Sequence, residues 1–389
     1  MKIGIAGPMT LHALNVDFGS SPIPEGYDFP MVSWLINALI ERGHRVVAYT
    51  ASVGLDEPRV FKGKNLTVCV ARYRTEHRAR DLFRLERRDI LKLMKAHPAD
   101  IINAHWSYEF AWAAIDSQVP TLVTLQDHAL SILKYQLDPY RLMRLIMNYI
   151  VIHRAQFLAA NSYYLFDVLG SRSRRKARVI PNFYAKALEA KASTTSGKKN
   201  YIVSVCNGFG RRKNIETALR AFSLVRNQEP AIVYQLIGSG MEPGGPAERF
   251  ALINGITDGV IFSGNLPHDA VTTAVRDASI FLHPAKEESF GVSVLEAMVL
   301  GTPVIGGKRS GNVPHLLEKG EAGEVCDVSS PQGICNAILK LHRDRNKRED
   351  IAIRARYIAN AKYSERNVVP LYEKAYKDIL DGRFFSSGS

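Results

Sequence analysis

Residues 286–305 read KEESFGVSVLEAMVLGTPVI, and the order of elements in this stretch indicates how the second half of the chain folds. The apolar run IFLHPA comes directly before it and predicts a strand. We expect a short loop containing Glu288, a helix that begins near Gly291 and ends before Gly301, and a new strand at TPVI. Glu296 would lie about a turn and a half inside this helix. A strand, a helix and a second strand in this order are typical of a parallel α/β sheet, which binds ligands at the carboxyl ends of its strands.

The same alternation runs through both halves of the chain. Short apolar strands such as MKIGIAG and ADIINAHW alternate with amphipathic helical patterns, and the alternation restarts at NYIVSVCNG after a break rich in Ala, Ser, Thr, Gly and Lys. We therefore expect two doubly wound parallel-sheet α/β domains, residues 1–183 and 199–364, joined by a linker at 184–198. Residues 365–389 would form a C-terminal helix and a frayed tail.

The composition is that of a folded globular protein, with 46% hydrophobic and 23% charged residues in a chain of 389. No apolar run approaches the eighteen or so residues that a membrane span requires. The first residues enter a strand directly and do not resemble a signal peptide, and the 4 cysteines show neither metal-like nor paired spacing. We expect a cytoplasmic protein with reduced thiols.

The net charge of +13 is concentrated in two tracts of the first half. Residues 72–95 contain nine Arg and Lys against four acids, and residues 134–178 contain nine against two. This excess predicts either an anionic partner, such as a membrane surface, or a solvated basic face without a partner. Segment 140–154 could accordingly be an interfacial helix or an ordinary domain helix. Nucleic acid is not an expected partner, because the tracts lack interleaved aromatic residues and any known module.

The turn NGFGRRKN, residues 207–214, follows the strand YIVSVC and precedes a helical pattern. Gly208 allows the backbone to approach a ligand closely, and a helix N-terminus offers free N–H groups to an anion. Arg212 and Lys213 add full positive charges at the same place. The turn therefore suits a diphosphate, although a purely structural turn would have a similar sequence.

The helix start near Gly291 could provide a second part of such a site. The backbone N–H groups of Phe290, Gly291 and Val292 could hold phosphate oxygens. The carboxylates of Glu288 and Glu296 are acceptors suited to the vicinal hydroxyls of a ribose or a hexose. The helix dipole alone would favour an acid at Glu288, but it accounts poorly for Glu296.

The segment ESFGVSVLEAM, together with GTPVI, resembles the E-x7-E signature of the retaining family 4 glycosyltransferases of GT-B fold. Further ordered matches are GH at 43–44, VIPN at 179–182, Gly264 and Leu266 at a nucleotide-base turn, SGNVP at 310–314 and the region from Tyr363 onward. The resemblance implies GT-B architecture, with two Rossmann-like domains that face a central cleft. It also implies that the C-terminal helix returns to the N-terminal domain.

The resemblance implies transfer of a hexose from a nucleotide diphosphate sugar to a hydroxyl acceptor, with retention at the anomeric carbon. Cell-surface polysaccharide, lipopolysaccharide or glycolipid synthesis would be the setting. Arg212 and Lys213 would neutralise the donor diphosphate, and Glu288 would hold the sugar hydroxyls. The implied donor-binding residues are Gly208, Leu266, Ser289, Phe290, Gly291, Val292 and Glu296. No metal or other cofactor is expected, because no two aspartates are spaced as in the D-x-D motif of GT-A enzymes.

Some residues depart from the family pattern. Gly26 aligns with the first of two paired glycines, but Tyr27 replaces the second. Gln126, followed by Asp127, stands where a sugar-contacting histidine often occurs in the family. His105 ends a predicted strand and aligns with a family position at the edge of the cleft. We expect Gly26, His105, Gln126 and Asp127 on the sugar and acceptor side.

These departures leave other functions open. The chain could be a catalytically silent sugar-nucleotide-binding protein, or a sugar-nucleotide epimerase of GT-B fold. Asn214 replaces the glycine that follows the phosphate-binding lysine in the family. The sequence does not choose among UDP, GDP and ADP donors.

Overall fold

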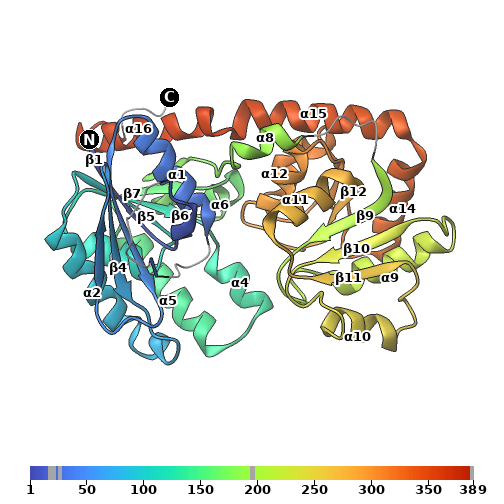
Figure 1. Cartoon of the computed structure of the whole chain (residues 1–389), viewed down its shortest axis with the longest axis horizontal. Coiled ribbons are helices and arrows are strands. Elements are labelled where there is room, and N and C mark those ends of the chain that lie inside the picture. Colours follow the sequence, from blue (N-terminus) through green and yellow to red (C-terminus); the bar gives the residue numbers. More distant parts are fainter. Residues whose placement is uncertain (16–22, 25–28, 193–197, 386–389) are drawn as a thin grey trace. The chain divides into compact units, whose positions relative to one another are not determined.

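The computed structural model describes residues 1–15, 23–24, 29–192 and 198–385, and its contacts divide the chain into two compact units. Unit 1 comprises Met1–Phe183 and Glu365–Ser389, and unit 2 comprises Tyr184–Ser364. Each unit is built on one sheet with helices packed on its faces (Figure 1). The predicted pair of parallel α/β sheets is confirmed.

The sheet of unit 1 has eight strands in the order β3-β4-β2-β1-β5-β6-β7-β8, and every neighbouring pair is parallel except β3 with β4. The strands are β1 (Lys2–Ala6), β2 (Arg45–Ser52), β3 (Arg59–Lys62), β4 (Leu66–Arg72), β5 (Ile101–His105), β6 (Thr121–Leu125), β7 (Phe157–Ala160) and β8 (Ala177–Val179). The central strands β5 and β6 are buried along their whole length because both faces of the sheet are covered.

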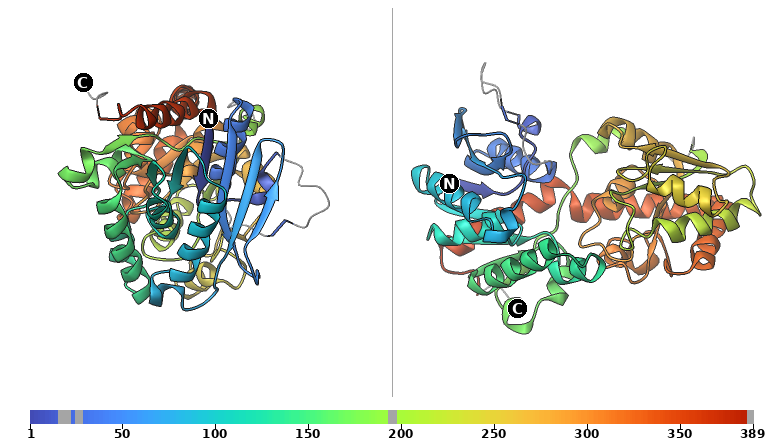
Figure 2. Two further views of the ribbon diagram at one scale, coloured as in Figure 1. Left: turned by 90° about the vertical axis from the view of Figure 1, so that its left-hand side faces the viewer. Right: turned by 90° about the horizontal axis from the view of Figure 1, so that it is seen from below.

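Two apolar cores lie on the two faces of this sheet (Figure 1; Figure 2). The helices of unit 1 are α1 (Pro30–Glu41), α2 (Arg84–Ala96), α3 (Glu109–Asp116), α4 (Ala129–Tyr135), α5 (Pro139–Arg154), α6 (Tyr163–Val168), α7 (Ser171–Arg174) and α16 (Glu365–Leu380), with the 3-10 turns η1 (Leu11–Ala13) and η2 (Arg78–Asp81). Leu35 of α1 packs with Tyr372 of α16 in one core, and Ile90 of α2 packs with Phe110 of α3 and Val151 of α5 in the other.

Helix α16 confirms the predicted return of the C-terminal helix to the N-terminal domain. Its Tyr376 hydroxyl accepts a hydrogen bond of 2.8 Å from Asn103 Nδ2 in β5. The carboxylate of Asp378 lies 2.6 Å from Arg178 Nη1 in β8. The apolar face of α16 is buried, so the last helix is part of the unit 1 core.

The sheet of unit 2 has six parallel strands in the order β11-β10-β9-β12-β13-β14. The strands are β9 (Lys199–Val205), β10 (Val233–Ile237), β11 (Val260–Gly264), β12 (Ala278–His283), β13 (Val304–Gly307) and β14 (Glu324–Cys326). The helices are α8 (Ala187–Lys191), α9 (Ile215–Arg226), α10 (Pro246–Ile253), α11 (His268–Asp277), α12 (Val292–Val299), α13 (Val313–Leu316), α14 (Pro331–Arg343) and α15 (Arg345–Tyr363), with the 3-10 turn η3 (Glu318–Gly320). Helices α9 and α14 pack on one face of the sheet, and α12 and α15 pack on the other.

Residues 184–198, where the sequence suggests a linker, contain helix α8. Leu188 of α8 and the preceding Tyr184 are buried in the unit 2 core. The Tyr184 hydroxyl lies 2.8 Å from Asn360 Oδ1 in α15. The described first part of this segment is therefore folded onto unit 2.

No helix in the described parts of the chain is both long enough and apolar enough to span a bilayer.

Candidate active site

The turn after β9 begins the candidate site at the carboxyl edge of the unit 2 sheet. Gly208 in this turn has φ 96°, a conformation that glycine adopts without strain. Asn214 ends the turn and is the N-cap residue of α9. Its φ of 61° lies in the left-handed region, which asparagine tolerates better than most residues. Its buried Nδ2 donates to the carbonyl oxygens of Pro284 at 2.9 Å and Val328 at 2.7 Å. Asn214 thus ties the turn to the loops that follow β12 and β14.

The structure brings the predicted cations of this turn against acids of the loop after β12. Lys213 Nζ lies 2.9 Å from Glu288 Oε2, and Arg212 Nη1 lies 3.3 Å from Glu287 Oε2. Glu287 is a site residue beyond those predicted from the sequence, and its one sequence signal is its place directly before Glu288. Because β9 and β12 are neighbours in the sheet, their following loops meet at one edge.

The two adjacent carboxyls have pKa values shifted in opposite directions. Burial disfavours the charged form of Glu288, but Lys213, His283 and Arg212 outweigh burial, so the pKa of Glu288 is lowered. For Glu287, burial outweighs the attraction of Arg212, and the pKa is raised. Of the two carboxyls, Glu288 is therefore the one whose ionised form its surroundings favour.

His283, the last residue of β12, is a further polar group beside Glu288. Its Nε2 is buried without a hydrogen-bond partner among the described residues, and it lies 3.7 Å from Glu288 Oε2, beyond hydrogen-bond distance. Burial lowers the pKa of the His283 imidazole to about 4, so the ring is neutral at pH 7. One sequence signal points to this residue, a histidine at the carboxyl end of the buried run IFLH.

The predicted SGNVP element holds the backbone of the Glu288 loop. The N–H of Asn312 donates to the carbonyl oxygen of Glu288 at 2.9 Å, and Asn312 Nδ2 donates to that of Phe290 at 3.0 Å. Gly311 has φ 59°, and a Cβ there would collide with the carbonyl oxygen of Glu288. The backbone that carries the acid is therefore fixed by a glycine and an asparagine from the next loop.

The start of α12 offers the expected backbone donors. Gly291 is the N-cap of α12 with φ 100°, and Val292 is the first helical residue. Within the described part of the chain, the N–H groups of Phe290 and Gly291 donate no hydrogen bond, so they can receive an anion. The Phe290 ring is buried in the core, where it packs edge-on against Tyr363 at 5.9 Å. Only the backbone of Phe290 is thus available to a ligand.

The remaining donor-side candidates also lie around this edge. Glu296 lies in α12, and its Oε1 is 3.5 Å from Nε2 of His268 at the start of α11. The hydrogen bond with Glu296 raises the pKa of His268. Leu266, just before α11, packs partly buried against the α12 core, and Ser289 is buried with its Oγ 3.5 Å from Glu287 Oε1.

The sugar-side candidates His105 and Gln126 belong to a buried polar network in unit 1. His105 Nδ1 lies 3.2 Å from Gln126 Nε2, and Gln126 Oε1 accepts 2.9 Å hydrogen bonds from Asn161 and Asn182. Burial lowers the pKa of His105 to about 3, so its ring is neutral at pH 7. These side chains gather at the carboxyl ends of β5, β6, β7 and β8, and Asn182 comes from the predicted VIPN element.

Asp127 follows Gln126 and is held by an aromatic residue. Asp127 Oδ1 accepts a 2.8 Å hydrogen bond from the hydroxyl of Tyr108, which is buried. The guanidinium of Arg144 lies 3.3 Å from the centre of the Tyr108 ring and 3.4 Å from Glu109 Oε2. The candidate Gly26 lies outside the described residues.

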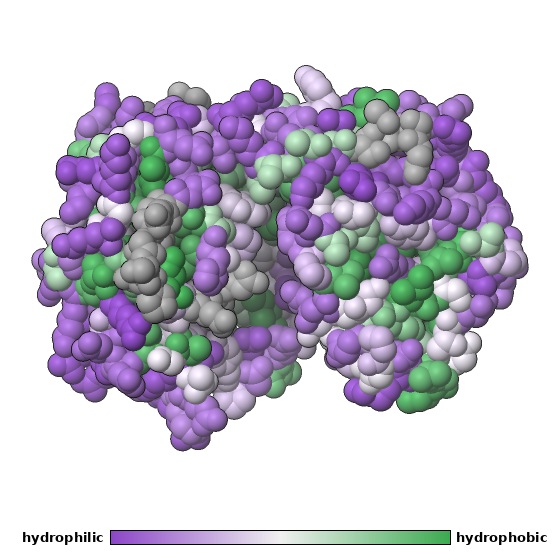
Figure 3. Space-filling model, in the orientation of Figure 1, coloured by the Kyte–Doolittle hydropathy of each residue, from purple (hydrophilic) through white to green (hydrophobic). Residues whose placement is uncertain are grey.

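Part of the positive charge of the two basic tracts is neutralised inside unit 1. The paired residues are Arg72 with Asp89, Arg74 with Asp81 and Glu86, Arg144 with Glu109, Arg154 with Asp116, and Arg178 with Asp378. Helix α5 buries Met147 and Val151, while Leu142 is 49% and Tyr149 62% exposed. Figure 3 shows apolar side chains gathered between hydrophilic ones on the face it presents.

Among the described residues, no group of three or more His, Cys, Asp or Glu side chains has an arrangement suited to a metal ion.

Two known protein families match adjoining parts of the chain. The family described as Glycosyltransferase Family 4 matches residues 32–185. The family described as Glycosyl transferases group 1 matches residues 186–357. The matched ranges follow each other without a gap.

A curated relative is similar over about three quarters of its length. The chain is 24% identical to the N-acetyl-alpha-D-glucosaminyl L-malate synthase of Bacillus anthracis over 296 residues, which cover 72% of this chain and 75% of the relative. Two further curated relatives are matched over 33% of their own length.

The sucrose-phosphate synthase of Thermosynechococcus elongatus has a similar fold, with a TM-score of 0.76, 18% identity, and coverage of 98% of this chain and 100% of that one. HepE of Anabaena, solved in complex with UDP and glucose, has a TM-score of 0.70 and 17% identity, with coverage of 97% of this chain and 100% of that one. At these identities the likeness concerns the fold. Together with the two family matches, it shows that the chain belongs to the group 1, family 4 glycosyltransferases of GT-B fold, which transfer a sugar from a nucleotide-sugar donor.

Proposed function

We propose that this glycosyltransferase moves a hexose from a nucleotide diphosphate sugar to a hydroxyl group of a glycan or lipid-linked glycan, with retention at the anomeric carbon. The observation that carries the proposal is the 2.9 Å pair between Lys213 Nζ and Glu288 Oε2, together with the amides of Phe290 and Gly291, which donate no hydrogen bond within the described residues. Cations and free N–H groups suit a diphosphate, and an ionised carboxylate next to them suits sugar hydroxyls.

The cations would act on the leaving group. When the bond between the anomeric carbon and the diphosphate oxygen breaks, negative charge develops on that oxygen, and Lys213 and Arg212 stabilise it. Both ammonium and guanidinium are held in place before the donor binds, by Glu288 and Glu287 respectively. Charge stabilisation by groups already in position needs little reorganisation during the reaction.

The acceptor would attack from the face that the diphosphate leaves, which preserves the anomeric configuration. The acceptor oxygen forms the new bond to the anomeric carbon, and its proton passes to the departing diphosphate oxygen. Glu288 holds the sugar by accepting hydrogen bonds from its hydroxyls. The lowered pKa of Glu288 keeps the acceptor lone pairs available at neutral pH.

Glu296 is proposed to bind the ribose of the donor. Its side chain is 20% exposed, so it remains accessible from the start of α12. His268 at 3.5 Å would orient the carboxylate without occupying both of its oxygens. Leu266 would pack beside the nucleotide base.

We further propose that the reaction requires no metal ion, because Arg212, Lys213 and the amides supply the counter-charge for the diphosphate. Activity should then persist in the presence of EDTA. Loss of activity in EDTA that returns with Mg²⁺ or Mn²⁺ would refute this part of the proposal.

An anionic membrane surface is proposed as a peripheral partner of unit 1. Leu142, Ile146 and Tyr149 of α5 are 49%, 40% and 62% exposed, and Arg141 lies among them. Flotation with vesicles that contain anionic lipid should show binding that weakens with salt. Exchange of Leu142 and Ile146 for Ser should reduce it, whereas unchanged binding by this variant would exclude the α5 surface.

The donor and the stereochemistry can be tested directly. Thermal shift with UDP, GDP and ADP hexoses should identify one donor that raises the melting temperature, because a ligand that binds only the folded state stabilises it. Proton NMR of the product should show the anomeric configuration of the donor. An inverted product would refute retention. A donor that binds but is neither transferred nor hydrolysed with any acceptor would identify a silent binding protein instead.

A further inference from the structure

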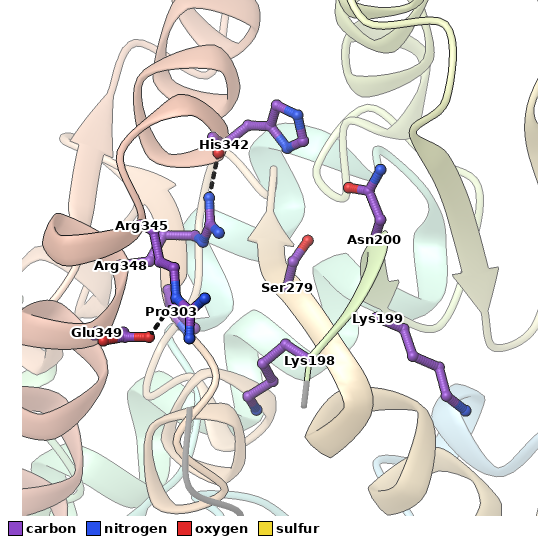
Figure 4. Close-up of a pocket in the computed structure, with 9 residues that line it drawn as sticks. All are labelled: Lys198, Lys199, Asn200, Ser279, Pro303, His342, Arg345, Arg348 and Glu349. Atoms are coloured by element: carbon purple, nitrogen blue, oxygen red, sulfur yellow. Dashed lines mark hydrogen bonds and ion pairs between the residues drawn. The ribbon is translucent and has the colours of Figure 1, made fainter. Parts of the chain in front are cut away.

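A cavity of about 310 Å³ lies at the amino edge of the unit 2 sheet. In Figure 4, the start of β9 forms one side of it and the junction between α14 and α15 forms the other, with Ser279 of β12 between them. The charged residues that line it are Lys198, Lys199, Arg345, Arg348 and Glu349. A cavity of this size is at the lower end of the range for small-molecule sites.

The lining carries more positive charge than its own acids neutralise. Glu349 is the one carboxylate of the lining, and it lies 2.9 Å from Arg345 Nε. Lys199 Nζ lies 3.2 Å from Asp277 Oδ2, just outside the lining. Lys198 and Arg348 form no ion pair with a carboxylate in the described part of the chain.

Lys198 is held in place although it lacks a counter-charge. Its Nζ donates to Thr302 Oγ1 at 2.9 Å and to the carbonyl oxygen of Arg276. Burial lowers the pKa of Lys198 to about 8, and the attraction of Asp277 only partly offsets burial. A bound anion would supply the missing charge and favour the ammonium form.

Arg348 is fixed in a similar way. Its Nη1 donates to the carbonyl oxygens of Leu341 and His342 at the carboxyl end of α14, where a helix favours positive charge. Burial lowers the pKa of Arg348, and the neighbouring Arg345 adds to this effect. Lys198 and Arg348 thus add two positive charges to a lining whose one carboxylate, Glu349, already pairs with Arg345, and this excess favours an anion.

We propose that this cavity is a second ligand site, which binds a small molecule through one or two phosphate groups. The site is distinct from the donor site, because β9 runs from Lys199 at the cavity to Val205 beside the phosphate turn, a distance of about 20 Å. Ammonium and guanidinium groups are the usual protein partners of phosphate oxygens. The alternative is that Lys198 and Arg348 only satisfy nearby oxygen atoms, as Lys176 does in unit 1, and the binding test below separates the two.

The test uses inorganic pyrophosphate as the probe in isothermal titration calorimetry. The full chain with Lys213→Ala serves as the background, so that the proposed donor site contributes little. Lys198→Gln and Arg348→Gln are added to it together, because these two lining cations form no ion pair with a carboxylate in the described part of the chain, and thermal unfolding checks that the variant is folded. The matched control carries Arg220→Gln and Lys362→Gln on the same background, which removes the same charge from exposed positions of unit 2 outside the cavity.

The background protein and the matched control should bind one pyrophosphate with equal affinity. The double cavity variant should bind it at least about tenfold more weakly, because it lacks two charge-assisted contacts. Equal affinity in the cavity variant and the control, or no binding to the background protein at millimolar pyrophosphate, would overturn the proposal. Donor turnover does not enter the measurement, so failure here is separate from failure of the proposed transferase function.

Discussion

Lys213 Nζ lies 2.9 Å from Glu288 Oε2, although 75 residues separate the two in the chain. The contact follows from the sheet order, which places β9 beside β12 and so brings the two following loops to one edge. Asn214 fixes the lysine loop to Pro284, and Asn312 fixes the backbone of Glu288. The pair therefore belongs to a rigid arrangement that exists before any donor binds, as charge stabilisation of a leaving group requires.

Lys213→Ala is expected to lower kcat/KM for the donor about a hundredfold, because one cation no longer stabilises the leaving diphosphate. Steady-state kinetics would measure this, with circular dichroism to confirm the fold. Arg211→Ala is the matched control, since Arg211 is an exposed cation of the same turn. Wild-type rates in the Lys213 variant would remove the phosphate role from this residue.

Glu288→Gln should lower kcat at least about a hundredfold while it changes donor affinity less, because the amide keeps the shape but loses the charge and half of the acceptor capacity. Glu287→Gln is the adjacent comparison, and it should cost less, since Glu287 acts only by holding Arg212, whose Nη1 lies 3.3 Å from its Oε2. Single-turnover rates measured by rapid quench separate the rate of sugar transfer from the affinity for the donor. Equal losses in the two variants would mean that Glu288 has no special role toward the sugar.

Glu296→Ala is expected to weaken donor affinity about tenfold to a hundredfold, as is typical for loss of a hydrogen bond to a charged group. Calorimetric titration of the donor and of its free nucleoside diphosphate should show the same loss, because both contain the ribose. His268→Gln should have a smaller effect, since it removes only the imidazole that lies 3.5 Å from the Glu296 carboxylate and leaves that carboxylate in place. Unchanged affinity in Glu296→Ala would place the ribose contact elsewhere.

The alternation of strands and helices was sufficient to predict both sheets and the meeting of the two donor-side loops, because parallel strands end at one edge. The side chains that are buried and the charged residues that form ion pairs could not be predicted in the same way. Glu287 was overlooked because its contact with Arg212 depends on side-chain packing. The net charge of a tract also does not show which arginines are paired, because Arg178 meets Asp378, which is 200 residues away in sequence. Segment 184–198 has a linker-like composition, yet Leu188 is buried in unit 2.

The buried His283 should make the fold sensitive to acid. Its pKa is lowered from 6.5 to about 4, so the unfolded chain binds more protons, and stability is lost as the pH falls from about 6.5 toward 4. One such group corresponds to about 2 to 3 kcal/mol of unfolding free energy between pH 7 and pH 4.5. Urea denaturation at a series of pH values would measure it. The His283→Gln variant should show a shallower pH dependence than the wild type, and an equal slope would contradict the assignment.

Asn214 combines a left-handed backbone with two buried hydrogen bonds, and two substitutions can separate these contributions. Asn214→Gly keeps the backbone conformation but loses the bonds to Pro284 and Val328, so unfolding free energy should fall by about 1 to 3 kcal/mol. Asn214→Ala loses the same bonds and also pays about 1 kcal/mol for φ 61°. Urea denaturation should therefore rank the wild type above Asn214→Gly and Asn214→Gly above Asn214→Ala. A glycine variant as stable as the wild type would show that the amide bonds add no net stability, and the tie between the phosphate turn and the loop after β12 would then rest on the backbone alone.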